Sequence, residues 1–196
     1  MSSISHNGKL ILIIGPSGVG KGTLLKMLKK NHSEMFFPIS ATTRLKRGRE
    51  KDGENYYFLT KNNFEKKIKN NEFLEYAFVH NSYYYGTLKK PIFHALKKGK
   101  TVVREVDYQG FLSIQKIIPE NVLRSIFLLP PSVEILKNRI KARSNISEED
   151  LNKRINSLKE ELKFMDKCNL KMSQIDGDIK SSYDIFEGCI MKCVYN

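Results

Sequence analysis

The feature that most constrains this chain is a glycine-rich loop between an apolar run and a helical pattern. The apolar run, Leu10–Ile14, reads as a buried strand, and residues 20–30 have the pattern of a helix. Glycines let a backbone fold around an anion without a Cβ in the way, and the following helix directs unpaired N–H groups at the same point. Lys21 can reach terminal phosphates as a flexible point charge. The stretch predicts a nucleoside triphosphate cradle, with a glycine-rich turn that binds nothing as the alternative; its residues are Gly15, Pro16, Ser17, Gly18, Val19, Gly20, Lys21, Gly22 and Thr23.

One position of this loop departs from the usual pattern. A Ser or Thr normally follows the lysine and its hydroxyl touches Mg²⁺, whereas this chain has Gly22 there and Thr23 next. The Gly-Lys-Gly-Thr ending resembles the loop of many nucleoside monophosphate kinases. That resemblance implies that Mg²⁺ is held mainly by nucleotide oxygens and water, which suits an ion that dehydrates reluctantly, and that Thr23 contacts phosphate.

The charge balance leaves two readings of the partners. Lys and Arg number 34 against 21 Asp and Glu, a net charge of +13 over 196 residues. Such an excess fits a nucleic acid partner or a site for several phosphates on a lysine-rich surface. Many lysines stand in mixed runs such as residues 66–69, which resemble polar helix faces more than a basic tail. We therefore expect small-molecule partners and no nucleic acid.

The cysteines and apolar runs suggest a location. Cys168, Cys189 and Cys193 form no zinc pattern with histidines, so reduced thiols in a cytoplasmic protein are expected. No apolar run is long enough to span a membrane, and the first one stops at Gly15-Pro16, so we expect no signal peptide. Monomer and dimer both stay open.

Strand and helix patterns alternate along most of the chain. This alternation is typical of a parallel α/β sheet, and short strand patterns between residues 39 and 90 read as an insertion. The expected strands are 10–14, 36–40, 55–59, 73–79, 82–85, 101–106, 125–129 and 170–173. The expected helices are 20–30, 61–69, 91–98, 111–117, one capped by Ser132, 147–167 and 181–194.

Residues of the insertion suit a second, phosphate-bearing substrate. Arg44 and Arg47, with Arg49 nearby, offer forked guanidinium groups that match phosphate oxygens, and Tyr56 and Tyr85 add phenolic donors. Each of these side chains has a plainer reading as a solvated surface group.

Glu75 is an acid in an otherwise apolar strand pattern. A lone carboxylate in such a strand usually faces solvent. It would instead serve recognition if it accepted two hydrogen bonds from a guanine edge, one from N1–H and one from the exocyclic amine.

A set of motifs in fixed order resembles guanylate kinases over about residues 10–160. Together they are far more specific than the loop alone. The motifs are residues 15–21, Ser40-Ala41-Thr42-Thr43-Arg44 with Arg47 and Glu50, Asp52-Gly53 with Tyr56-Tyr57-Phe58, 72–76, Tyr84-Tyr85-Gly86-Thr87, 105–110 and 127–132.

The resemblance implies a role for each matching residue. The loop and Lys21 would hold ATP, while Glu105 and Asp107 would order the substrate and the water shell of Mg²⁺. The guanine would be read by Ser40, Glu75 and Thr87, and the GMP phosphate side would be formed by Arg44, Arg47, Glu50, Tyr56 and Tyr85. The catalytic set would be Lys21, Arg44 and three lid arginines, Arg139, Arg143 and Arg154.

The resemblance also implies a fold and a reaction. The fold would be a three-layer α/β/α P-loop core with a parallel sheet (about 1–38 and 91–196), a small mixed-strand GMP-binding insertion (about 39–90) and a helical lid (about 139–154). The reaction would transfer the γ-phosphoryl group of ATP to GMP, and possibly to dGMP. The alternative in a different class is a protein-interaction module. Modules derived from this family typically lose the glycine loop, which is intact here.

Several positions depart from the family pattern. Residues 47–50 read Arg-Gly-Arg-Glu, one extra residue falls within 81–83, and Glu105 replaces a common aspartate. The Asn-Asp-Asp that the family carries on the adenine side is not recognisable in residues 173–178.

Overall fold

The structure is a computed structural model that describes residues 8–79, 82–143 and 147–195, without the side chains at positions 143, 150, 152–154, 157 and 159. Its main sheet is entirely parallel, with strand order β6-β1-β7-β8. The bounds are β1 Leu10–Ile14, β6 Val102–Glu105, β7 Leu123–Leu129 and β8 Leu170–Ser173.

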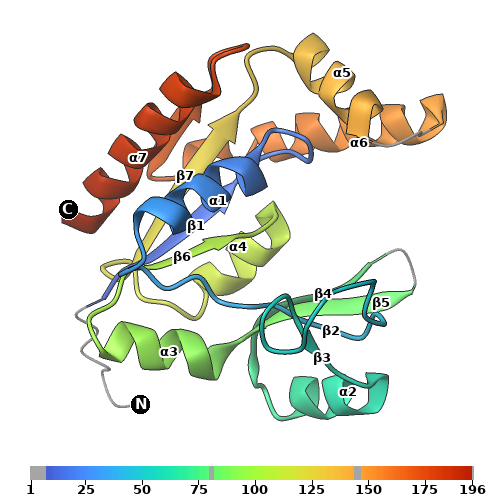
Figure 1. Cartoon of the computed structure of the whole chain (residues 1–196), viewed down its shortest axis with the longest axis vertical. Coiled ribbons are helices and arrows are strands. Elements are labelled where there is room, and N and C mark those ends of the chain that lie inside the picture. The colour runs from blue at the N-terminus through green and yellow to red at the C-terminus, as the bar shows by residue number, and fades with distance from the viewer. Residues whose placement is uncertain (1–7, 80–81, 144–146, 196) are drawn as a thin grey trace.

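Helices cover both faces of this sheet (Figure 1). One face packs in an apolar cluster with α1, α5, α6 and α7, and the other face packs with α3 and α4. The sheet and its two helix layers confirm the expected three-layer core. The helices are α1 Lys21–Asn31, α3 Lys89–Lys97, α4 Tyr108–Gln115, α5 Val133–Arg143, α6 Glu148–Leu162 and α7 Ile179–Tyr195, and a 3₁₀ turn spans Met165–Lys167.

A second sheet of mixed direction, with order β3-β2-β5-β4, lies beside the core. Stacked rings hold helix α2 to it: Phe64 stacks on Phe73 at 4.2 Å and on Tyr84 at 5.1 Å between ring centroids. The elements are β2 Ala41–Thr42, β3 Tyr57–Phe58, α2 Lys61–Lys69, β4 Phe73–Val79 and β5 Tyr83–Leu88.

The segment 36–40 was expected to be a strand but instead passes from one sheet to the other. Phe36 forms a single bridge with Val102 of the core, while the carbonyl of Ser40 accepts from the Tyr57 amide in the second sheet. Pro38 between them has no N–H to donate to a ladder. The strand therefore begins only at Ala41.

Several helix boundaries differ from expectation by one to five residues, most of all the start of α4 and the end of α6. Helix α4 begins three residues before Phe111 because the Asp107 carboxylate accepts from the Gly110 amide and caps it at Tyr108. Helix α6 ends at Leu162 rather than near Lys167, and the 3₁₀ turn follows.

The topology brings the functional segments to one edge. In a parallel sheet the carboxyl ends of the strands share an edge, so the loop after β1 and Glu105 at the end of β6 lie close together. None of the helices within the described ranges is both long and apolar enough to cross a membrane.

Candidate nucleotide-binding site

The glycine loop is shaped by close backbone contacts. Gly15 has φ of +145° and Gly20 has φ of +101°, a region that L-residues with side chains rarely enter. A Cβ at Gly15 would lie 2.5 Å from the Leu128 carbonyl oxygen. The loop therefore depends on glycine, and it delivers the chain to the start of α1 at Lys21.

Lys21 lies over the loop that precedes it. Its Nζ donates to the Gly15 carbonyl oxygen at 2.5 Å and to the Pro16 carbonyl oxygen at 3.1 Å. Gly22, by contrast, has open space where a Cβ would stand, so a serine would fit there sterically. Packing therefore does not explain why this position lacks the hydroxyl group of the usual loop.

A cavity of about 750 Å³ opens beside the loop. Glu105 and Arg139, both expected from the sequence, line it together with the loop residues. The opposite wall is the segment between β8 and α7 and the first turns of α7, formed by Gln174, Ile175, Gly177, Asp178, Ile179 and Ser182.

The sequence analysis assigned no site residue to this wall because residues 173–178 do not match the adenine-side motif of the family. Asp178 accepts from the Ser181 amide at 2.9 Å and so caps the start of α7, a local role that hides its place at a cavity. Only its position indicates a place at the site, because the segment follows β8 at the carboxyl edge of the parallel sheet.

Arg139 connects α5 to this wall. Its Nη1 donates to Gln174 Oε1 at 2.7 Å, and its Nη2 lies 3.6 Å from Asp176 Oδ1. Arg143 is the last residue of α5 and Arg154 belongs to α6, but the side chains of both lie outside the described part of the chain.

A half-buried carboxylate near Lys21 was also missed. Burial raises the pKa of Glu161 on α6; the charge of Lys21 opposes this shift and that of Asp107 adds to it. Glu161 therefore belongs to the electrostatic surroundings of Lys21, although it stands in an ordinary amphipathic helix pattern.

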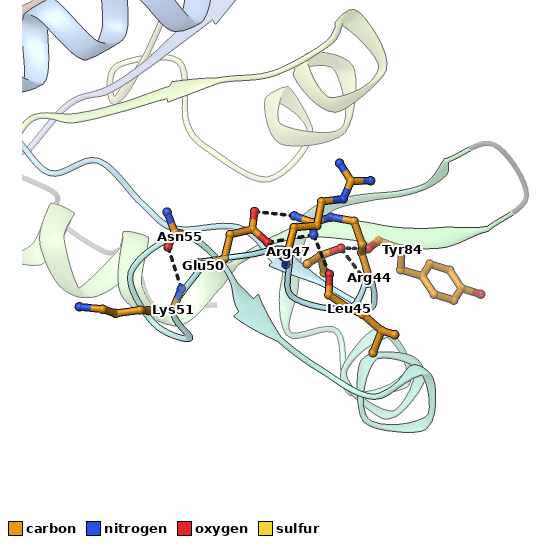
Figure 2. Close-up of polar contacts among 8 residues, drawn as sticks. Arg44, Leu45, Arg47, Glu50, Lys51, Asn55 and Tyr84 are labelled. Atoms are coloured by element: carbon orange, nitrogen blue, oxygen red, sulfur yellow. Dashed lines mark hydrogen bonds and ion pairs between the residues drawn. The ribbon is translucent and has the colours of Figure 1, made fainter.

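Figure 2 shows the polar contacts that hold Arg44 in the insertion. Its guanidinium makes a bidentate pair with Glu50, at 2.9 Å to Oε2 and 2.8 Å to Oε1, and only 7% of the side chain is exposed. The backbone amide of Arg47 donates to the same carboxylate at 2.8 Å. Sequence reasoning placed Arg44 on a polar loop, and the structure buries it.

These contacts also set the ionisation of the pair. The hydrogen bonds from Arg44 and from the Arg47 amide lower the pKa of Glu50 to about 2. Hydrogen bonds to Glu50 and Tyr85 raise the pKa of Arg44 above its usual value. The Tyr56 ring lies 5.4 Å from the Arg44 guanidinium and 6.1 Å from the Tyr85 ring, so these predicted phosphate-side residues converge.

Glu75 and Thr87 meet at a second point of the insertion, and Arg104 of the core connects Ser40 to Glu75. Glu75 and Thr87 are register partners on β4 and β5, and the Thr87 hydroxyl donates to Glu75 Oε1. Burial raises the pKa of Glu75, and the contacts with Thr87 and Arg104 offset part of that shift. Arg104 was missed by sequence reasoning, although a charge within Val102–Val106 is a visible break in an apolar strand.

The fold and the glycine loop are those of a P-loop protein that carries a second, mixed sheet as an insertion. The chain matches the guanylate kinase family over residues 7–187 and belongs to that family. It is 46% identical over 157 residues to the guanylate kinase of Carboxydothermus hydrogenoformans, covering 80% of this chain and 76% of that protein. It is 45% identical over 176 residues to the guanylate kinase of Caldanaerobacter subterraneus subsp. tengcongensis, covering 90% and 84%.

A solved structure shows the same fold. The crystal structure of guanylate kinase from Anaplasma phagocytophilum superposes with a TM-score of 0.72 over 99% of this chain and 90% of that one, at 23% identity. The resemblance drawn from the ordered motifs is therefore confirmed at the level of family and fold.

Proposed function

We propose that this chain is a guanylate kinase that transfers the γ-phosphoryl group of ATP to GMP, giving ADP and GDP. The observation that carries the substrate choice is Glu75, a carboxylate buried in the insertion beside Thr87. A carboxylate there accepts from N1–H and the exocyclic amine of guanine, whereas adenine has no N1–H to donate. An unpaired buried carboxylate is costly, so the site disfavours AMP.

ATP occupies the cavity beside the glycine loop. The loop amides and Lys21 hold its phosphates, and the adenine lies toward the wall formed by residues 174–182. Because Gly22 offers no hydroxyl, Mg²⁺ would be held mainly by nucleotide oxygens and water, and Glu105 and Asp107 would order its water shell. The ion would supply positive charge to neutralise the phosphates.

GMP occupies the insertion. Ser40, Glu75 and Thr87 read the base, while Arg44, Arg47, Tyr56 and Tyr85 hold the phosphate. Glu50 acts by fixing Arg44, because both of its oxygens face that guanidinium and the Arg47 amide.

Catalysis is alignment and charge neutralisation. Phosphoryl transfer needs the two substrates in line and the developing charge balanced, with little covalent help from the protein. Lys21 and Arg44 supply cations from the two substrate sites, and Arg139, Arg143 and Arg154 supply them from the lid. The reaction takes place in the cytoplasm with small-molecule partners, and we propose no nucleic acid partner.

A coupled ADP-release assay with GMP, dGMP, AMP, CMP and UMP in parallel tests the proposal. We expect turnover that depends on ATP and Mg²⁺ and is selective for guanine nucleotides. Lys21→Ala should lower kcat by roughly a hundredfold or more, because a cation at the phosphates is lost. Lys29→Ala, in the last turn of the same helix and exposed, is the matched control and should turn over normally. Full activity of Lys21→Ala would overturn the role of the loop, and GMP binding without turnover would favour a binding module.

A further inference from the structure

Arg104 stands where the strand pattern calls for an apolar residue. It lies on β6 opposite Leu12 of β1. Side chains two residues apart on a strand share a face, and its neighbours on that face, Val102 and Val106, are 0% and 7% exposed and belong to the apolar cluster under α3 and α4. A charge placed there is costly unless it has partners.

The partners of Arg104 are two residues of the predicted guanine site. Its Nη2 donates to Ser40 Oγ at 2.8 Å and lies 3.9 Å from Glu75 Oε1. Both ends of this contact are largely shielded, with 17% of the Arg104 side chain and 15% of the Glu75 side chain exposed. Arg104 therefore links the core sheet to two segments of the insertion, at the point where the base is read.

The surroundings of Glu75 show what this link contributes. Thr87 on β5 donates to Oε1, and Gly110 at the start of α4 packs against the side chain, where a Cβ would lie 3.6 Å from Glu75 Cγ. The charged groups that act on Glu75 are Arg104 from β6 and Asp107 from the cap of α4. Arg104 favours the carboxylate, whereas burial and Asp107 disfavour it. Of these two charged groups, Arg104 is therefore the one that stabilises the ionised form of Glu75.

The chemistry of guanine makes that charge matter. A carboxylate accepts hydrogen bonds at both oxygens, whereas a protonated carboxyl must donate from one of them. Since N1–H and the amine are both donors, a neutral Glu75 would lose one of its two contacts with the base. We propose that Arg104 is a positioning residue of the guanine site, which holds Glu75 and Ser40 in one arrangement and keeps Glu75 charged; this rests on the proposed function.

The test compares Arg104→Met and Arg104→Lys with the wild type, using GMP and IMP as acceptors between pH 5.5 and 8.5. IMP keeps O6 and N1–H but lacks the exocyclic amine. We expect Arg104→Met to raise KM for GMP by roughly tenfold to a hundredfold and to reduce the preference for GMP over IMP. The rise in KM for GMP should be largest at low pH. KM for ATP should stay within about twofold, since ATP binds elsewhere. Arg104→Lys keeps a cation and should retain more of the wild-type pH profile.

The matched control is Arg124→Met, which removes a cation from β7 on the other side of β1. Arg124 pairs with Ile11 near the start of the sheet, away from the loop, and its Nη1 donates to the Glu120 and Leu123 carbonyl oxygens. Its KM values and GMP-to-IMP preference should match the wild type.

Two results would overturn the inference while leaving the proposed function standing. One is an Arg104→Met enzyme with unchanged KM for GMP. The other is an equal loss for GMP and IMP with an unchanged pH profile, which would mean that Arg104 does not act through Glu75. If thermal unfolding shows that Arg104→Met does not fold, the test compares the KM for GMP and the pH profile of Arg104→Lys with those of the wild type. A wild type that does not phosphorylate GMP would instead defeat the proposed function itself.

Discussion

At the residue scale, Glu75 combines a buried position with a charge that the proposed chemistry requires. Burial raises its pKa, so as the pH falls Glu75 becomes protonated, and loses its charge, at a higher pH than an exposed glutamate does. We predict that Glu75→Gln raises KM for GMP by roughly tenfold to a hundredfold, because the amide offers one acceptor and one donor to two donors of the base. KM for ATP should stay unchanged in steady-state assays, and the wild-type KM for GMP should rise as the pH falls.

A glutamate outside the site provides the control. Glu65 on α2 is 41% exposed and lies 4.0 Å from Lys61 Nζ, and Glu65→Gln should behave as the wild type. Equal losses of GMP and ATP affinity in Glu75→Gln, or strong use of AMP by the native protein, would contradict a role in reading guanine.

At the scale of elements, a polar cluster joins the end of α1 to α7. His32 follows α1 and bonds to Glu187 of α7 at 2.6 Å and to Glu34 at 2.9 Å. The Tyr183 hydroxyl also donates to Glu187 at 2.6 Å, and Asn31 Nδ2 donates to that hydroxyl at 3.0 Å. Because α1 begins at the loop and α7 begins at the cavity wall, this cluster links the two helices that flank the cavity beside the glycine loop.

The cluster predicts a pH-dependent contribution to stability. Burial lowers the pKa of His32, but the hydrogen bonds to Glu187 and Glu34 outweigh it and raise the pKa above the ordinary value of 6.5. Protonated His32 is therefore favoured by folding, so its contribution is fully present below pH 6.5 and is lost as the pH rises through the raised pKa. His32→Gln should lower the free energy of unfolding at pH 6 by about 1 kcal/mol, a fall in Tm of roughly 3 °C, and by less at pH 8.5.

Thermal unfolding at the two pH values measures this difference. His94→Gln is the control, since His94 is exposed in the last turn of α3 and should show no such dependence. An equal destabilisation by His32→Gln at pH 6 and pH 8.5 would show that the charge of His32 contributes nothing.

At the scale of the whole molecule, the proposed mechanism requires closure. Lid helices α5 and α6 pack on one face of the core sheet, while β4 of the insertion contributes Leu74 to the cluster on the other face (Figure 1). Transfer needs the two substrates together with water excluded. The insertion and α5–α6 both carry arginines that we propose to contact the phosphates, so both nucleotides together should favour a closed form.

Small-angle scattering tests this closure with GMP alone, a non-hydrolysable ATP analogue alone, and both. We predict the smallest radius of gyration with both nucleotides. A separate distance measurement between labels on the insertion and the lid should give a shorter distance in the same sample. Lys21→Ala with both nucleotides should close less. An unchanged distance would refute closure even if kinase activity were established.

Local patterns along the sequence determined much of this protein. The bounds of α2, β4 and β8 agree with those expected from periodicity and turn residues, because each is a regular element whose pattern lies within a few residues. The loop could be assigned for the same reason, since its glycines, lysine and flanking elements are contiguous. The ordered motifs then identified the family.

Only the tertiary structure decided which polar residues are buried and what they face. Arg44 stands in a polar stretch yet is enclosed by Glu50 and aromatic rings, Arg104 reaches Ser40 and Glu75 across 64 and 29 positions of the chain, and the wall at residues 174–182 lines the cavity without any motif. A buried charge is tolerated only when it has partners, and those of Arg104 come from distant segments of the chain. That pairing depends on how the two sheets pack, a long-range property that no local pattern of residues contains.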